Sequence, residues 1–206
     1  MRRLLFSVGR LVLFLLAGGA ARAQDGVRTE PFVLGTTVHL HSTALGEDRL
    51  LNIALPQGYH PDSAARYPVV YLLDGSADED FIHIAGLYQF AAFPWLAWQP
   101  PSIVVGIANV DRKRDLTFPT TIAADKEQFP TTGGSAAFMD FLAREVIPLV
   151  EARYRANGER SLIGQSLSGL FATEALFKRP ALFGSCYMVS PSLWWDAESL
   201  LAQPAT

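Results

Sequence analysis

The most informative segment of this 206-residue chain is Ser161-Leu162-Ile163-Gly164-Gln165-Ser166-Leu167-Ser168-Gly169. Its first three residues indicate a short strand, and residues 167–177 have the apolar spacing of a helix. A serine on such a tight strand-to-helix turn projects from the sheet with its hydroxyl exposed, and the N–H of the next residue faces the oxyanion that forms after attack. The segment therefore predicts Ser166 as a nucleophile and Leu167 N–H as an oxyanion donor.

The turn around Ser166 needs small residues where the strand and helix backbones crowd together. Gly164 and Ser168, two positions before and after the serine, meet this demand, although serine replaces the usual second glycine. The alternative is that Ser166 caps the amino end of the helix, a position that serine often occupies. The pattern alone leaves both roles open.

A second oxyanion donor is expected in the loop after the third strand. Residues 68–73 form a continuous β-rich run, typical of a strand that is buried on both faces, and Asp74-Gly75-Ser76 follows it directly. The fold that carries a nucleophile of this kind supplies its second donor at this point. The candidates are the N–H groups of Gly75 and Ser76, and the alternative is an ordinary turn, for which Asp-Gly is equally suited.

Strands come first in this chain and then alternate with helices. Strands are expected over residues 32–41, 49–55, 68–73, 103–108, 161–163 and 186–189, and helices over residues 138–154 and 167–177. This order predicts an α/β fold with a mostly parallel sheet, covered on both sides, and an antiparallel hairpin at its amino end. Residues 109–132 lack periodicity and are expected to form a functional loop.

Composition excludes several classes of protein. Half of the residues are apolar and 18% are charged, which suits a packed core rather than disorder. A net charge of −3 without a basic stripe argues against nucleic-acid binding. The single cysteine, Cys186, lies in an apolar run and is expected to be a buried small side chain. No histidine has metal-ligand spacing with a carboxylate, so no metal site is predicted.

Residues 1–23 indicate a secretory signal peptide. The start is cationic, residues 11–16 are apolar, and Ala21-Arg22-Ala23 has the small-x-small pattern of a cleavage site. The alternative is a membrane anchor, but the apolar run is far shorter than the ~20 residues that span a bilayer. Cleavage takes four arginines and no acidic residue from a chain of charge −3, which leaves −7 on residues 24–206. We expect an exported protein, periplasmic or secreted, without stable membrane association.

Six motifs resemble, in order and spacing, the esterase family of the α/β-hydrolase superfamily, which includes enterochelin-esterase-like and S-formylglutathione-hydrolase-like enzymes. They are Tyr67–Gly75, Arg112–Thr117, Gly133-Gly134, Glu145–Pro148, Ala152–Arg155 and Ser190-Pro191-Ser192-Leu193-Trp194-Trp195-Asp196. The resemblance covers roughly residues 30–200. It implies a serine esterase that hydrolyses a small-molecule carboxylic ester, of siderophore type or an acyl thioester, through an acyl-enzyme on Ser166 and without a cofactor. Transfer to an acceptor alcohol uses the same acyl-enzyme and stays open.

The resemblance also suggests residues that contact the substrate. Arg114 is a candidate for holding an anionic group, and the alternative places it in a solvated loop of mixed charge. Trp194 and Trp195 are candidates for an aromatic wall, unless they pack in the core. His83 is expected on a helix near the site, where it could line the pocket.

The general base is not where this fold places it. The four histidines, His39, His41, His60 and His83, all precede Ser166, whereas the acid and the histidine of this fold follow the serine in the chain. We therefore expect the esterase domain, residues 24–206, to be incomplete at its carboxyl end and to lack the last two strands. The strand near Cys186 would then be an exposed edge, open to self-association. The alternative is a non-catalytic relative that binds a ligand or partner.

Cleavage of the signal peptide is directly measurable. Intact-mass analysis of the protein from its native source should give a mass below the 22.5 kDa of the full chain by the mass of residues 1–23, with Gln24 as the first residue. Retention of Met1 in the exported fraction would contradict this prediction.

Overall fold

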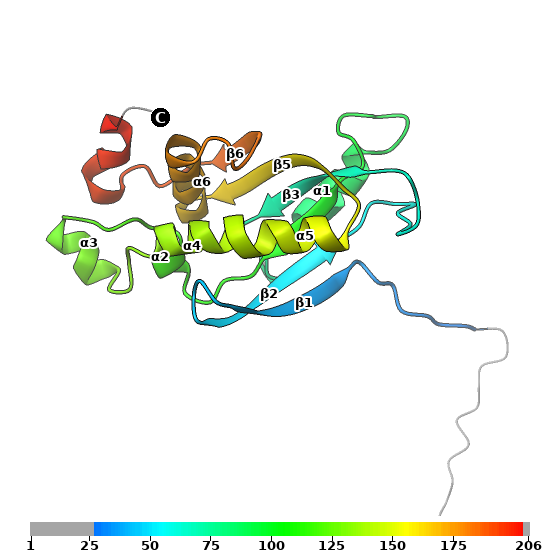
Figure 1. Cartoon of the computed structure of the whole chain (residues 1–206), viewed down its shortest axis with the longest axis horizontal. Helices are drawn as coiled ribbons and strands as arrows, with labels where there is room; N and C mark the ends of the chain where they lie inside the picture. Colours follow the sequence, from blue (N-terminus) through cyan, green and yellow to red (C-terminus); the bar gives the residue numbers. More distant parts are fainter. Residues whose placement is uncertain (1–26, 204–206) are drawn as a thin grey trace, which may run out of the picture. The chain divides into compact units, whose positions relative to one another are not determined.

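A six-stranded sheet forms the frame of the domain (Figure 1). The computed structural model describes residues 27–203, and the compact unit begins at Leu34. The strands lie in the order β1-β2-β4-β3-β5-β6. They are β1 (Thr36–Ser42), β2 (Glu47–Ala54), β3 (Tyr67–Leu72), β4 (Ile103–Ile107), β5 (Ala156–Gln165) and β6 (Ser185–Val189).

The pairing of the strands confirms the predicted fold class. β1 and β2 form an antiparallel hairpin, and β2 is also antiparallel to β4. The pairs β4–β3, β3–β5 and β5–β6 are all parallel. Parallel neighbours need crossover connections, and the helices of the domain supply them.

The helices cover the sheet unequally. They are α1 (Phe81–Ala91), α2 (Arg112–Asp115), α3 (Ala123–Gln128), α4 (Ser135–Phe141), the π-helical turn η1 (Leu142–Val146), α5 (Ile147–Arg153), α6 (Leu167–Lys178) and the segment η2 (Trp195–Ala202), whose 3₁₀ turns are interrupted by a kink. The continuous α4–η1–α5 rod crosses one face of the sheet, and α1 lies behind the other face (Figure 1).

Alternation along β3 shows why both faces are buried. Val69 and Tyr71 belong to the larger core, which also contains the buried residues of α4, α5 and α6. Val70 and Leu72 point to the smaller core, which contains Phe81 of α1. Successive strand residues face opposite sides of the sheet. A strand that is covered on both faces is therefore apolar at nearly every position.

The helix predicted over residues 138–154 is real but not uniform. Its middle turn is π-helical, and the Ile147 N–H donates to the Leu142 carbonyl oxygen, five residues earlier. Pro148 follows at once and has no N–H to donate. The wider turn accommodates this gap in the ladder without ending the helix.

Residues 109–132 contain two short helices, α2 and α3, which the sequence analysis did not predict. A buried ion pair anchors this segment, because Arg49 Nη1 of β2 donates to Asp115 Oδ2 at 2.7 Å and both side chains are 1% exposed. The Arg49 guanidinium also lies over the Phe138 and Phe141 rings. The loop is therefore fixed to the sheet rather than free in solvent.

The outer strand β6 ends the sheet within the described residues, 27–203. Tyr187 and Val189 are 44% and 50% exposed, and Cys186 is partly buried. Self-association through this edge stays a prediction. The predicted signal peptide lies outside the described residues. Among residues 27–203 no helix has the length and apolarity to cross a membrane.

Strand β5 and helix α6 approach each other closely at Gly164. A Cβ atom at this position would overlap the Ser168 carbonyl oxygen, whereas a Cβ at Gly86 in α1 would meet nothing within 4 Å. Gly164→Ala is therefore expected to destabilise the domain by about 3 kcal/mol through overpacking. Gly86→Ala is the matched control and should stabilise by about 1 kcal/mol, because alanine favours the helix. Urea unfolding of both variants tests this, and equal stabilities would refute it.

Candidate active site

Ser166 lies in a strained turn between β5 and α6. Its backbone has φ 60° and ψ −118°, a conformation that favours glycine. Among the hydrogen bonds that hold the turn, the Ser166 N–H donates to the Val189 carbonyl oxygen at 3.0 Å, and the Leu170 N–H donates to the Ser166 carbonyl oxygen at 2.9 Å. The side chain is only partly buried. This is the strand–turn–helix geometry that exposes a nucleophilic hydroxyl.

Two of the three predicted oxyanion donors keep their place as candidates. Leu167 is the first residue of α6, so its N–H has no acceptor within the helix. The Gly75 N–H donates to the Ile107 carbonyl oxygen at 3.0 Å and is thus committed to the sheet, which corrects its assignment as a donor. The Ser76 N–H has only a long contact, 3.3 Å, with Glu79 Oε2, and it remains the candidate in this loop.

A buried carboxylate joins the loop after β3 to the turn at Ser166. Asp74 is 7% exposed and adopts φ 53°. Its Oδ1 accepts from Arg112 Nε and Asn109 Nδ2, each at 2.7 Å. Its Oδ2 accepts from Arg112 Nη2 and Ser168 Oγ, each at 2.8 Å. Four charge-assisted bonds make Asp74 the centre of a network, which we call the Asp74 hub (Asp74, Asn109, Arg112 and Ser168).

The electrostatics of the hub favour an ionised carboxylate. Burial by itself would raise the pKa of Asp74, but the hydrogen bonds from Arg112, Asn109 and Ser168 outweigh it, so the pKa lies below its usual value. The same contact with Asp74 raises the pKa of Arg112, although burial opposes this. Both groups are therefore charged across the whole neutral range.

Ser168 connects the hub to the turn itself. Its Oγ accepts from the Gln165 N–H at 2.7 Å and lies 2.8 Å from both Asp74 Oδ2 and the Gln165 carbonyl oxygen. Arg112 Nη2 also donates to that carbonyl oxygen, at 3.2 Å. Ser168, which replaces the usual glycine, is therefore fully buried and hydrogen-bonded to both Gln165 and Asp74, so it stabilises the turn.

Arg114 is not free to hold a substrate anion, which corrects the prediction. Its Nη1 and Nη2 donate to the two carboxylate oxygens of Glu47 at 3.0 and 2.6 Å, and its Nε donates to Asp115 Oδ1 at 2.7 Å. Bidentate pairing of this kind is structural, and it lowers the pKa of Glu47. The arginine that reaches the turn at Ser166 is Arg112, which the sequence analysis did not single out.

The two tryptophans of the predicted aromatic wall differ in their exposure to solvent. Trp195 is fully buried and donates its Nε1–H to the Phe118 carbonyl oxygen at 2.9 Å, so it is a core residue and cannot touch a substrate. Trp194 is 50% exposed, with its ring centroid 6.0 Å from that of Phe129. It keeps its role as a candidate.

Asp196 bonds residues of the segment near residue 120 and of η2. The Ser199 hydroxyl bonds its Oδ2 at 2.6 Å, and groups of Thr120 and Thr121 bond its Oδ1. The hydrogen bond from Ser199, followed by those from the threonines, lowers the pKa of Asp196 to about 2. Its negative charge therefore serves to hold the segment near residue 120 against η2.

No histidine contacts the hydroxyl of Ser166 within residues 27–203. His41 Nδ1 lies 2.7 Å from Asp48 Oδ1, and His60 Nδ1 lies 3.9 Å from Asp62 Oδ2. His83 is exposed in the first turn of α1. The group that does meet Ser166 Oγ is Ser192 Oγ, at 3.1 Å. No histidine that could serve as a general base is thus among the contacts of Ser166, the predicted nucleophile, in the described part of the chain. The same residues contain no cluster of three His, Cys, Asp or Glu side chains able to hold a metal ion.

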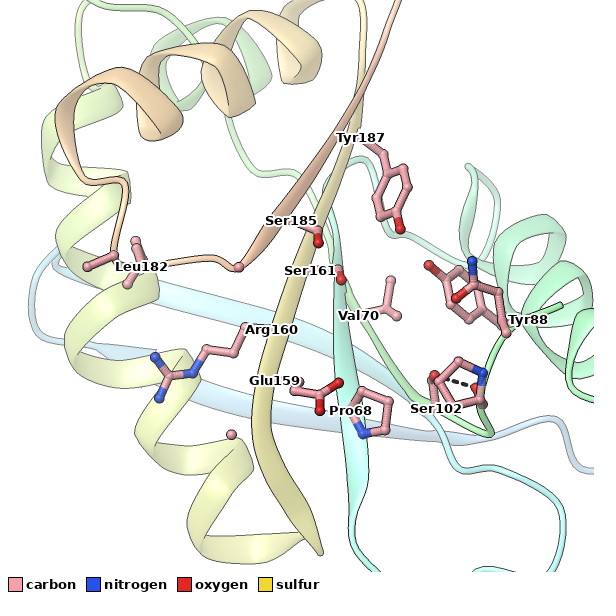
Figure 2. A pocket seen from close by; sticks show the side chains of 15 residues that line it. Pro68, Val70, Tyr88, Ser102, Glu159, Arg160, Ser161, Leu182, Ser185 and Tyr187 are labelled. Carbon is pink, nitrogen blue, oxygen red and sulfur yellow. Dashed lines mark hydrogen bonds between the residues drawn. The ribbon is translucent and has the colours of Figure 1, made fainter. Parts of the chain in front are cut away.

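A cavity of about 600 Å³ lies elsewhere on the sheet (Figure 2). Val70, Ser161, Ser185 and Tyr187 rise from β3, β5 and β6 on one side of it, and Tyr88 of α1 faces them. None of the predicted site residues lines it. Ligands of open α/β sheets bind outside the carboxyl ends of the strands, and Ser166 lies at that end of β5. The predicted site is therefore separate from this cavity.

Comparison with known proteins gives consistent matches. Residues 42–204 match a sequence family described as "Putative esterase". The ferri-bacillibactin esterase BesA of Bacillus subtilis is 29% identical over 193 residues, which cover 87% of this chain and 66% of BesA. A siderophore triacetylfusarinine C esterase of Aspergillus fumigatus is 30% identical over 178 residues, which cover 76% of this chain and 55% of that enzyme.

The fold has matching solved structures as well. An IroE-like serine hydrolase from Shewanella oneidensis superposes with a TM-score of 0.75 and 39% identity, covering 82% of this chain and 54% of that protein. The chain thus spans between about half and two thirds of the length of these three relatives.

Loss of the charge at the centre of the hub should weaken the fold in a pH-dependent way. Asp74→Asn is expected to cost about 2 kcal/mol at pH 7, less than a fully buried pair because Arg112 retains some solvent contact. Because folding lowers the pKa of Asp74, its ionised form stabilises the fold above the usual carboxylate pKa, and this stabilisation is lost as the pH falls through the lower folded value. The difference from wild type should therefore shrink in acid.

Urea unfolding between pH 7 and pH 3 measures this difference. Asp78→Asn, in the same loop but exposed, is the matched control and should change stability by less than about 0.5 kcal/mol at either pH. A cost for Asp74→Asn that is the same at both ends of the range would contradict the assignment.

Proposed function

The chain belongs to the esterase family of the α/β-hydrolase superfamily, and on that premise we propose that it hydrolyses carboxylic esters through an acyl-enzyme on Ser166. One observation carries the proposal: Ser166 stands in the strained turn at the carboxyl end of β5, beside the Leu167 N–H at the first position of α6. This backbone conformation is strained for every residue except glycine, and strained residues of this kind cluster at functional sites. A serine here is therefore consistent with a functional hydroxyl.

The proposed reaction has two stages. Ser166 Oγ attacks the ester carbonyl carbon while its proton passes to a hydroxide ion from solvent, and the electron pair of the carbonyl bond moves to oxygen. The N–H groups of Leu167 and Ser76 donate to this oxyanion. Collapse expels the alcohol, which takes up a proton, and water then releases the acid from Ser166. The described residues supply the nucleophile and the donors for both stages.

The Asp74 hub supports this role by holding the two donors in one frame. Ser76 follows Asp74 by two residues, and Leu167 precedes Ser168 by one. Asp74 and Ser168 bond each other directly at 2.8 Å, so the two donor-bearing backbones cannot separate without breaking a buried bond. A preorganised donor pair is the largest single contribution in most acyl-transfer sites.

For the substrate we propose an ester of the siderophore type. Two curated relatives are named as esterases of ferri-bacillibactin and of triacetylfusarinine C. Trp194 stands two residues after Ser192, which touches Ser166, and its exposed indole would face an aryl or acyl group bound there. We also propose that the enzyme acts outside the cytoplasm, on the strength of the cationic, then apolar, amino-terminal residues.

A fluorophosphonate probe tests the nucleophile without requiring the natural substrate. Ser166 Oγ would form a bond to phosphorus as fluoride leaves, with hydroxide ion as the acceptor of the serine proton. Peptide mass spectrometry is expected to find the adduct on Ser166 at a rate that rises with pH, and Ser166→Ala should abolish it.

Ser185→Ala serves as the matched control, since Ser185 is exposed at the start of β6 and lines the distant cavity. This variant should label like wild type. Absence of the adduct from Ser166, or equal labelling of several serines, would overturn the proposed nucleophile.

A further inference from the structure

Ser192 belongs to the motif after β6 and has no role in the proposal above. It is 5% exposed, and its N–H donates to the Ser166 carbonyl oxygen at 2.9 Å. The adjacent Pro191 packs close to Gly169 of α6, where a Cβ atom would come within 3.0 Å of the Pro191 Cα. Backbone and packing contacts thus fix Ser192 against the turn that carries the nucleophile.

The side chains meet as well. Ser192 Oγ lies 3.1 Å from Ser166 Oγ, and within residues 27–203 this is the hydrogen bond that satisfies the buried Ser192 hydroxyl. Buried hydroxyl groups almost always have a partner. Here the partner is Ser166 Oγ, the atom that would react, so this hydrogen bond depends on the protonation state of Ser166 Oγ.

The direction of the hydrogen bond follows from the charge on Ser166 Oγ. In the resting state either hydroxyl can donate. As a base removes the Ser166 proton, Oγ becomes negative and can only accept, whereas Ser192 keeps its proton and can turn to donate it. A hydrogen bond to an ionised oxygen is shorter and roughly twice as strong as one between neutral groups.

We propose that Ser192 is a catalytic residue whose hydroxyl donates to Ser166 Oγ as that atom is deprotonated, so that the alkoxide-like nucleophile is stabilised. The proposal rests on Ser166 being the nucleophile. In the step with a fluorophosphonate, the Ser166 proton goes to hydroxide, the Oγ–P bond forms, the P–F bond breaks and fluoride departs. Ser192 retains its own proton throughout.

The test measures the rate of fluorophosphonate labelling of Ser166 against pH in the full chain. Ser192→Ala is expected to slow labelling by about 10- to 100-fold near neutral pH and to move the midpoint of the pH profile to higher pH. Ser192→Cys keeps the size of the side chain but has only a weak S–H donor, so it should behave in the same way. Ser192→Thr keeps the hydroxyl and should stay within a few-fold of wild type.

The control is Ser190→Ala, an exposed neighbour on the same segment, which should leave both rate and pH profile unchanged. Thermal unfolding confirms that each variant is folded. Labelling of Ser192→Ala and Ser192→Cys at the wild-type rate, or a slower rate without a shifted pH profile, would overturn the role of Ser192 while leaving the nucleophile intact. Failure of wild type itself to label at Ser166 would overturn the proposed function, and with it this inference.

Discussion

The buried carboxylate of Asp74 is the interaction on which the rest of the site depends. It lies where β3 ends, and it is bonded by side chains from the segment after β4 and from the first turn of α6. Two segments that are far apart in the sequence therefore bond the carboxylate oxygens of a third. Since a buried charge without partners is costly, these loops are held together as long as the carboxylate is ionised.

Much of this architecture could be predicted from local patterns. The runs around Val70 and Val105 are almost entirely apolar, which is typical of strands covered on both faces. The turn at Ser166 was predicted because small residues flank it at a fixed spacing between a strand and a helix. In both places, short-range chemistry determines the structure.

The site residues that depend on distant partners were harder to predict. Arg112 and Arg114 are two positions apart in the same charged segment, but one reaches Asp74 and the other pairs with Glu47 of β2. Trp194 and Trp195 differ in burial because consecutive residues point in different directions. The Gly75 N–H was predicted to be an oxyanion donor, but it donates to Ile107, which belongs to a strand more than thirty residues away. Sequence spacing carries no information on such choices.

The left-handed backbone at Ser166 also has a meaning for how this sequence changes over time. Glycine adopts that conformation without strain, so stability alone would favour its appearance at this position. Glycine at this position would also remove the hydroxyl that Ser192 Oγ contacts at 3.1 Å. Under the proposed function, the serine hydroxyl is retained at this position at a small expense in stability.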